Sequence, residues 1–219
     1  MTYKILISAP YFQPVIGDYR DIFEKYDMEL LVPNVNERMS EQELLPIIED
    51  VDGVISGDDR FTGRVLEKAR KLKVISKWGT GIDSIDAESA TRLGISVCNT
   101  PGAFTRPVSD TVLGYILCFA RKLPWMDRDI REGRWEKRKG AALHESTLGI
   151  VGVGDIGKEV ARKARAFGMQ LLGNDVVEMP SEFVAEMQIN MMPLDELLSQ
   201  ADYITLNCTM STTSYHIID

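Results

Sequence analysis

The sequence predicts an α/β fold in which parallel strands alternate with helices, organised as two consecutive domains. Through the first hundred residues, short apolar runs alternate with amphipathic segments, and the alternation resumes at Thr147 after a long helical stretch. Strands that alternate with helices at this spacing pair in parallel through crossover helices. The chain has 219 residues, of which 44% are hydrophobic and 26% charged. This length and composition suit two small globular domains.

The first domain is expected to contain five strands, each formed by a short apolar run. They are Lys4–Ser8, Glu29–Val32, Gly53–Ser56, Lys73–Lys77 and Ile95–Asn99. Helical patterns lie between them, at Tyr19–Lys25, Ser40–Val51, Thr62–Ala69 and Asp83–Leu93. Ser40 and Glu43 form a capping-box pattern, and Gly94 is placed to end the last of these helices.

The segment Asn99-Thr100-Pro101-Gly102 interrupts the pattern before a long helix. We place the domain boundary near Gly102, which gives domains of residues 1–102 and 103–219. Pro107 suits the first turn of the helix, and Leu123-Pro124 is expected to end it. The segment Trp125–His144 predicts a second helix and a loop. Apolar residues recur at helical spacing in the long helix, at Val108, Val112, Tyr115, Ile116 and Phe119.

Charge, cysteine usage and hydropathy exclude several classes of protein. The net charge of -8 argues against nucleic-acid binding, which needs a face rich in lysine and arginine. The three cysteines are odd in number and lack C-x-x-C spacing, which argues against disulfides and zinc sites. No apolar run approaches the roughly 18 residues of a membrane span, and the amino terminus lacks a secretory pattern. We therefore expect a soluble cytoplasmic protein that binds neither nucleic acid nor membrane.

A glycine-rich motif lies between a strand and a helix in the second domain. The apolar run Thr147–Val151 leads into Gly152-Val153-Gly154-Asp155-Ile156-Gly157. The first glycine permits a tight turn, the second lets a pyrophosphate approach the backbone, and the third lets helix and strand pack closely. The positive end of the helix dipole then faces the phosphates. The motif predicts a dinucleotide-binding loop formed by Gly152, Gly154, Asp155, Ile156 and Gly157.

The helix after this motif has an apolar side and a stop signal. Gly168 is placed to end it, and its apolar residues are Ile156, Val160, Ala161, Ala164 and Phe167.

Asp175 follows the next strand, Gln170–Gly173, and stands 23 residues beyond Gly152. A carboxylate there accepts hydrogen bonds from ribose hydroxyls and repels a 2′-phosphate, which favours NAD over NADP. The alternative for Asp175 is a helix cap, and the alternative for the glycines is a plain strand-to-helix turn. Methyltransferases also use a glycine-rich turn with an acidic strand end. The α/β domain before the motif and the third glycine favour a dinucleotide.

Four motifs occur in order along the chain. They are Lys77-Trp78-Gly79-Thr80-Gly81-Ile82-Asp83, Val97-Cys98-Asn99-Thr100-Pro101-Gly102, Leu148–Gly157 and Ala201-Asp202-Tyr203-Ile204-Thr205-Leu206-Asn207. With them the whole chain resembles the D-isomer-specific 2-hydroxyacid dehydrogenases, particularly the D-3-phosphoglycerate dehydrogenase-like branch. The resemblance implies a flavodoxin-like parallel-sheet substrate domain followed by an incomplete Rossmann dinucleotide-binding domain. It also implies NAD-dependent hydride transfer at the CH–OH group of a small D-2-hydroxy acid or its 2-oxo acid.

The resemblance also assigns binding residues. The loop of Trp78, Gly79, Thr80 and Gly81 would bind the substrate carboxylate through backbone amides. Glycines let the main chain approach closely, and converging N–H groups form an anion-binding nest. The alternative for this loop is a plain turn between strand and helix.

Further positions follow from the same resemblance. Cys208-Thr209-Met210-Ser211 matches the loop beside the nicotinamide, with Thr209 where a proline is usual. Asn207, Cys208 and Thr209 are therefore expected to bind the cofactor. Thr100 and Pro101 match the crossover between the domains, and Asp110 stands where the family usually has a glutamate. The long helix from Thr105 and the arm through Trp135 match the family's dimer contact, so we expect a homodimer.

Acid–base groups for the reaction are missing from the sequence. Hydride transfer at a hydroxy acid needs a general base, usually histidine, and an arginine to hold the substrate carboxylate. Neither His144 nor His216 matches the family's catalytic histidine. The resemblance places the catalytic Arg, Glu and His beyond Asp219, so we interpret the chain as part of a longer dehydrogenase, inactive alone. The alternative is a non-catalytic NAD-sensing module that binds a partner.

The identity of the substrate is open at this point. Arg60 and Lys77 have the charge to meet a phosphate or a second carboxylate, but solvated surface charge is the favoured interpretation. Ser56 stands where phosphoglycerate enzymes often place an arginine, so phosphoglycerate is not assigned.

Overall fold

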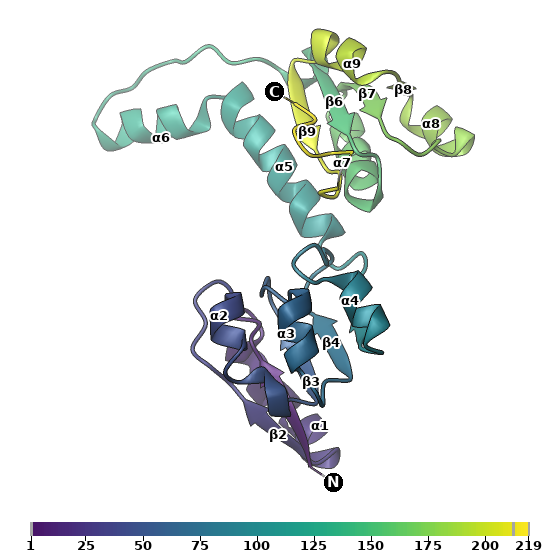
Figure 1. Cartoon of the computed structure of the whole chain (residues 1–219). Helices are drawn as coiled ribbons and strands as arrows, with labels where there is room; N and C mark the ends of the chain where they lie inside the picture. Colours follow the sequence, from purple (N-terminus) through teal and green to yellow (C-terminus); the bar gives the residue numbers. More distant parts are fainter. Residues whose placement is uncertain (1, 212, 219) are drawn as a thin grey trace. The chain divides into compact units, whose positions relative to one another are not determined.

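A computed structural model describes residues 2–211 and 213–218; Met1, Thr212 and Asp219 lie outside the described residues. The first expected domain begins at Met1 and the second ends at Asp219, so these two end residues of the expected domains are not described. The contacts divide the chain into two compact units, Met1–Ala103 and Phe104–Asp219. Each unit has its own parallel sheet, as Figure 1 shows.

The sheet of the first unit has five parallel strands in the order β2-β1-β3-β4-β5. This is the strand order of a flavodoxin-like sheet. The strands differ from the predicted runs by no more than one residue at either end. Their bounds are β1 (Tyr3–Ile7), β2 (Met28–Leu31), β3 (Gly53–Ser56), β4 (Val74–Lys77) and β5 (Ser96–Cys98).

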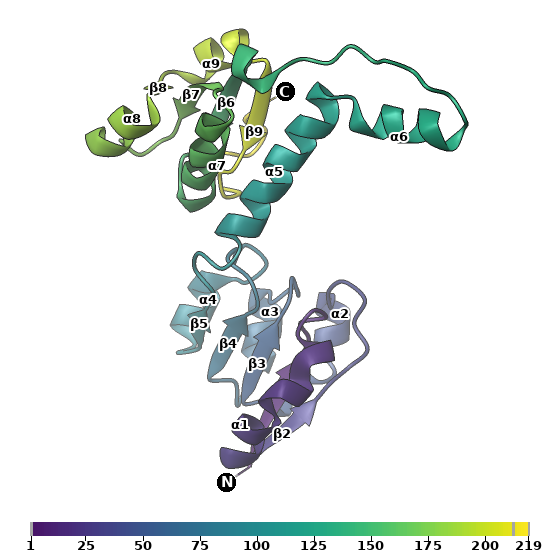
Figure 2. The same ribbon diagram turned by 180° about the vertical axis from the view of Figure 1, so that it is seen from behind.

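Helices cover both faces of this sheet. Leu6, Val54 and Ile75 face one side and pack against α2, α3 and α4, whereas Ile7 faces the other side and packs with Phe23 of α1. Figures 1 and 2, seen from opposite sides, show this arrangement. The bounds are η1 (Gln13–Tyr19), α1 (Arg20–Lys25), α2 (Glu41–Leu44), η2 (Ile48–Asp50), α3 (Gly63–Lys68) and α4 (Ala87–Arg92).

The predicted helix Ser40–Val51 is wrong, because the segment splits into α2 and the short 3-10 turn η2. Pro46 lies between them and lacks the N–H that a continuous helix needs. The capping box is confirmed: the backbone amide of Ser40 donates to Glu43 over 2.8 Å, and the Glu43 amide donates to the Ser40 hydroxyl over 3.4 Å. Gly94 has a φ of 72° and ends α4 as predicted.

The sheet of the second unit has four parallel strands in the order β8-β7-β6-β9. This matches four strands of the Rossmann order 3-2-1-4-5-6. The elements are α5 (Thr105–Ala120), α6 (Leu123–Arg131), η3 (Leu143–Glu145), β6 (Thr147–Val151), α7 (Asp155–Ala166), β7 (Gln170–Asn174), α8 (Ser181–Met187), β8 (Ile189–Met191), α9 (Leu194–Gln200) and β9 (Tyr203–Leu206).

The two faces of this sheet are covered by different helices. Leu148 and Ile150 of β6 form a core with α5, α7 and α8, while Val151 and Leu172 face the opposite side and pack on Leu197 of α9. This core fixes the start of α7 against the carboxyl end of β6.

The predicted apolar side of α5 is largely wrong. The buried residues are Ser109, Leu113, Ile116 and Ala120, while Tyr115 and Phe119 are exposed. The cause lies in α7, which packs against α5 and presents the small residues Ala161 and Ala164. Small and aliphatic side chains of α5 fit that surface, so the aromatic ones lie outside. The exposed apolar residues on this helix are Val108, Tyr115 and Phe119.

Two smaller predictions about helix ends need correction. Leu123-Pro124 does not end α5, which stops at Ala120; Pro124 lies in the first turn of α6. A proline is tolerated there because the first N–H groups of a helix have no partner within the helix. Phe167 is exposed rather than part of the buried side of α7, and Gly168 follows it with a φ of 77°.

Candidate functional site

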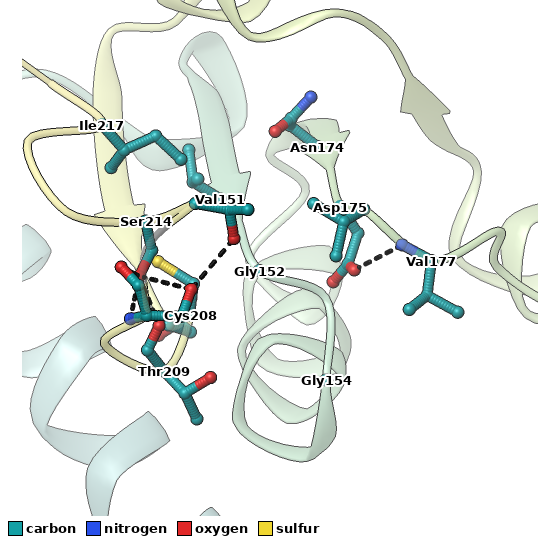
Figure 3. A pocket seen from close by; sticks show the side chains of 14 residues that line it. Val151, Gly152, Gly154, Asn174, Asp175, Val177, Cys208, Thr209, Ser214 and Ile217 are labelled. Carbon is teal, nitrogen blue, oxygen red and sulfur yellow. Dashed lines mark hydrogen bonds between the residues drawn. The ribbon is translucent and has the colours of Figure 1, made fainter. Parts of the chain in front are cut away.

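A cavity of about 310 Å³ lies at the carboxyl ends of β6, β7 and β9, within the second unit. The strand order reverses between β6 and β9, and ligands of open parallel sheets bind at such switch points. Figure 3 shows its walls on both sides of the glycine loop. The lining residues are Val151, Gly152, Gly154, Asn174, Asp175, Val176, Val177, Asn207, Cys208, Thr209, Ser211, Thr213, Ser214 and Ile217.

Two of the three motif glycines are required by the protein itself. Gly152 has a φ of 86°, and a Cβ added to it would lie 2.6 Å from the backbone nitrogen of Cys208. A Cβ on Gly157 would overlap the carbonyl oxygen of Gly152. These two glycines therefore allow the turn after β6 and the close packing of α7 on it.

Gly154 is different, because nothing in the described protein requires it. It caps the amino end of α7 with a φ of −72°, which any residue adopts, and no described atom beyond its chain neighbours lies within 4 Å of its Cβ position. It lines the cavity, so an added side chain would enter ligand space.

The acidic residue at the end of β7 lies on the rim of the same cavity. The Asp175 carboxylate accepts hydrogen bonds from the backbone amides of Val153, at 2.6 Å, and of Val177, at 2.9 Å. Figure 3 shows the second of these bonds. Asp175 is therefore fixed at the opening beside Gly152, and the described lining residues include no cationic side chain.

The segment after β9 forms the opposite wall. The Asn207 amide donates to the carbonyl of Val151 over 2.7 Å, which holds this segment against the glycine loop. The side-chain Nδ2 of Asn207 is buried and has no hydrogen-bond partner among the described residues. A buried donor without an acceptor costs about 1–3 kcal/mol.

Gly152, Gly154, Asp175, Asn207, Cys208 and Thr209 of the predicted set are brought together in this lining. Asp155, Ile156 and Gly157 lie in the first turn of α7, outside the lining. Sequence reasoning missed Val176 and Val177, although their position directly after an acidic strand end is a usable signal. It also missed Thr213, Ser214 and Ile217, which no sequence pattern marks, whereas Ser211 of the matched nicotinamide loop does line the cavity.

The second predicted site is the loop of Trp78, Gly79, Thr80 and Gly81, which follows β4 in the first unit. The Trp78 amide donates to Ser56 over 2.8 Å, and its indole lies 5.0 Å from the ring of Phe12. No described residue accepts a hydrogen bond from the amides of Gly79, Thr80 or Gly81. These amides are available to an anion.

The loop contains no left-handed residue, because neither Gly79 nor Gly81 is among the glycines with positive φ in the described chain. Its amides therefore lie in a turn rather than in the nest form that alternates right-handed and left-handed residues. The glycines instead permit close approach, since a Cβ on Gly79 would lie 3.1 Å from Cε of Lys77. The free amides therefore belong to an ordinary loop.

Lys77 is not the solvated surface charge that we expected. Its side chain is only 3% exposed, and its ammonium contacts the Asp58 carboxylate and the Gly57 carbonyl. Its aliphatic stem lies beneath the loop, and its charge is paired. Arg60 is exposed as predicted. Ser56 is buried and donates to Asp59 over 2.9 Å, which is a structural role.

Neither histidine contributes to the cavity. His144 is largely exposed beside Glu145, and His216 is exposed. Cys98, Cys118 and Cys208 are free thiols. In residues 2–211 and 213–218, no three His, Cys, Asp or Glu side chains gather as metal ligands, and no helix is long and apolar enough to cross a membrane.

The part of the chain that contains the cavity matches a known protein family. Residues 113–219, about half of the chain, match the family described as D-isomer specific 2-hydroxyacid dehydrogenase, NAD binding domain. The chain belongs to this dehydrogenase family. The matched segment contains the whole cavity, so the cavity lies in an NAD-binding domain of the 2-hydroxyacid dehydrogenase type.

Curated relatives extend the match over the first unit. A D-3-phosphoglycerate dehydrogenase of Methanocaldococcus jannaschii is 35% identical over 98% of the chain and 40% of that protein. A glyoxylate reductase of Thermococcus onnurineus is 35% identical over 99% of the chain and 66% of that protein. The chain thus spans between two fifths and two thirds of the length of these 2-hydroxyacid dehydrogenase relatives.

A solved structure shows the same fold. The D-lactate dehydrogenase from Aquifex aeolicus, complexed with NAD and lactic acid, superposes with a TM-score of 0.87. It is 24% identical and covers 99% of this chain and 63% of that one. At this identity the similarity establishes the 2-hydroxyacid dehydrogenase fold alone.

Proposed function

We propose that this chain carries the NAD-binding and carboxylate-binding parts of an NAD-dependent dehydrogenase for a small D-2-hydroxy acid. The proposal that the cavity binds a dinucleotide cofactor rests on Gly154. Close backbone packing explains why positions 152 and 157 are glycines. At Gly154 the lack of a side chain has no such explanation within the described protein, but it leaves space for a ligand in the cavity. The amino end of α7 directs free N–H groups and a positive dipole toward a pyrophosphate there.

We assign the other cavity residues by their chemistry. Asp175 would accept hydrogen bonds from the adenosine ribose, and its charge would repel a 2′-phosphate, which favours NAD over NADP. Val176 and Val177 lie beyond it as an apolar wall. The unpaired Nδ2 of Asn207 is a donor that a ligand oxygen would satisfy. When bound, NAD supplies the group that accepts or returns the hydride.

The carboxylate of a 2-hydroxy or 2-oxo acid is proposed to bind the unpaired amides of Gly79, Thr80 and Gly81, whereas the Trp78 amide is already paired with Ser56. Lys77 does not extend this site to a phosphate, because its ammonium is buried and paired with Asp58. Neither described site contains a histidine or a free arginine. We therefore propose that the chain alone binds both ligands without turning over substrate, and that acid–base groups outside these sites complete the reaction.

Two further proposals concern assembly and location. Tyr115, Phe119, Ile130 and Trp135 are each more than half exposed on α5, α6 and the following segment, and we propose that they pack in a homodimer. A cytoplasmic location is supported by the three free cysteines.

A glycine-to-alanine pair tests the cofactor proposal. NADH binding to the whole chain is measured by fluorescence for the unchanged protein, Gly154→Ala and Gly114→Ala. Gly114 is a matched control, because its Cβ position is also open and it lies outside the cavity lining.

We expect Gly154→Ala to weaken NADH binding at least tenfold without lowering the melting temperature, and Gly114→Ala to bind normally. An unchanged protein that does not bind NADH, or a Gly154→Ala variant that binds equally well, would contradict the proposal.

A further inference from the structure

We infer that Asn99 and Thr100 are positioning residues that aim the Thr80 and Gly81 amides at a bound carboxylate. This inference rests on the proposed function of the Trp78–Gly81 loop. The Asn99 side-chain Nδ2 donates to the carbonyl oxygen of Thr80 over 2.7 Å. Thr100 donates to the carbonyl oxygen of Gly79 twice, from its backbone N over 2.9 Å and from its Oγ1 over 3.0 Å.

Because the peptide group is planar, these contacts to the carbonyl oxygens also fix the directions of the following N–H groups. The described chain contains no cis peptide bond. In a planar trans peptide the C=O and the following N–H point in opposite directions. Holding the Gly79 carbonyl therefore sets the direction of the Thr80 N–H, and holding the Thr80 carbonyl sets that of the Gly81 N–H. Both amides point away from Asn99 and Thr100, and no described residue accepts a hydrogen bond from either.

The loop needs this control because glycines flank both peptides. Gly79 and Gly81 have no side chain to restrict backbone rotation, so ordering them on binding carries a large entropy cost. The entry to the loop is held elsewhere, by the bond from the Trp78 amide to Ser56. Asn99 and Thr100 hold the remaining peptides in advance, which raises affinity through preorganisation.

The test uses the whole chain, labelled with ¹⁵N and titrated with pyruvate as a monocarboxylate probe. Asn99→Ala removes one donor without changing the charge. Thr100→Val removes the hydroxyl but keeps the shape, and Thr100→Ser restores the hydroxyl. Thr91→Val is the matched control. The Thr91 hydroxyl donates to the Ala87 carbonyl over a distance of 2.8 Å, and this bond lies within α4 rather than in the loop.

In the unchanged chain, pyruvate is expected to shift the Thr80 and Gly81 amide resonances. Asn99→Ala and Thr100→Val should each weaken that binding about three- to tenfold, as expected for one lost hydrogen bond. Thr100→Ser and Thr91→Val should bind normally, and NADH affinity should be unchanged in all four variants. A merely structural role would lower the melting temperature without this selective loss.

Two results would overturn the inference, and they differ from each other. If Asn99→Ala and Thr100→Val bind pyruvate at the same amides as tightly as the unchanged chain, the positioning role is wrong and the carboxylate site stands. If pyruvate shifts neither amide in the unchanged chain, the proposed carboxylate site is itself wrong, and the positioning role fails with it.

Discussion

The carboxylate of Asp175 accepts a hydrogen bond from the backbone amide of Val153, 2.6 Å away. This bond joins the end of β7 to the middle of the glycine loop after β6. The two sequence signals for a dinucleotide, an acidic strand end and a glycine motif, are thus in direct contact. A change in Asp175 is therefore expected to act on the ribose site and on the shape of the loop.

The first prediction concerns cofactor choice. Asp175→Ala removes the proposed ribose acceptor and the charge that repels a 2′-phosphate, so we expect about tenfold weaker NADH binding. The preference for NADH over NADPH should fall by a similar factor. Fluorescence titration with both cofactors checks this, with Asp195→Ala in α9 as an exposed control. An unaltered preference would show that Asp175 is only a structural link.

The second prediction separates the glycines by stability. Gly157→Ala places a methyl group against the Gly152 carbonyl, so the turn or the first turn of α7 must shift. We expect a loss of about 1–3 kcal/mol, the usual cost of overpacking. Urea unfolding followed by circular dichroism measures it, beside Gly114→Ala. Equal stability of the two variants would mean that the close contact is not maintained in solution.

The third prediction is a pH dependence of the arm after α5. Asp129 is 1% exposed and accepts hydrogen bonds from Arg138, at 2.6 Å, and Arg134, at 2.7 Å. These guanidinium groups hold the pKa of the Asp129 carboxyl well below its ordinary value of 3.8. A carboxyl group whose pKa is lower in the folded state than in the unfolded state stabilises the fold at pH values above its unfolded-state pKa. This stabilisation is lost as the pH falls through the lower, folded-state pKa.

Melting temperatures of the unchanged protein and of Asp129→Asn should therefore differ most near neutral pH. The difference should narrow progressively below about pH 4. A difference that stays constant from pH 7 to pH 3 would contradict an ionised Asp129 as its source.

The fourth prediction concerns self-association. Phe119→Asp places a charge on the exposed apolar side of α5 and should shift a dimer toward monomer by tenfold or more in dissociation constant. Sedimentation velocity over a range of concentrations checks it. Tyr26→Asp, at an exposed aromatic residue of the first unit, serves as the control. If the unchanged chain sediments as a monomer at all concentrations, the proposed homodimer is wrong.

Sequence periodicity located the strands of the first unit, β6 and β7 well, because a buried parallel strand is a continuous apolar run, but it did not predict the short strand β8. The run Gly53–Ser56 became β3 without change of bounds. The glycine motif was equally informative, since Gly152 and Gly157 are required by backbone geometry. In each of these positions the local chain contains the physical reason for the structure.

The features that sequence missed depend on neighbours distant in the chain. The rotation of α5 was set by the small residues of α7, which apolar spacing within α5 does not report. Lys77 became buried because Asp58 and Gly57, about twenty residues earlier, meet its ammonium. The serine-rich wall of the cavity is held by the Ser214 hydroxyl, which donates to the Thr209 carbonyl and accepts from the Ser211 amide.

Gly154 also has a consequence for the divergence of related chains. Purifying selection on Gly152 and Gly157 acts through folding, and it persists whether or not the cavity is used. Selection on Gly154 acts only while a ligand occupies the cavity, because a Cβ there meets no described atom within 4 Å beyond its chain neighbours. In a descendant that lost its cofactor, Gly154 would therefore be the first of the three to drift, and its replacement would record that loss.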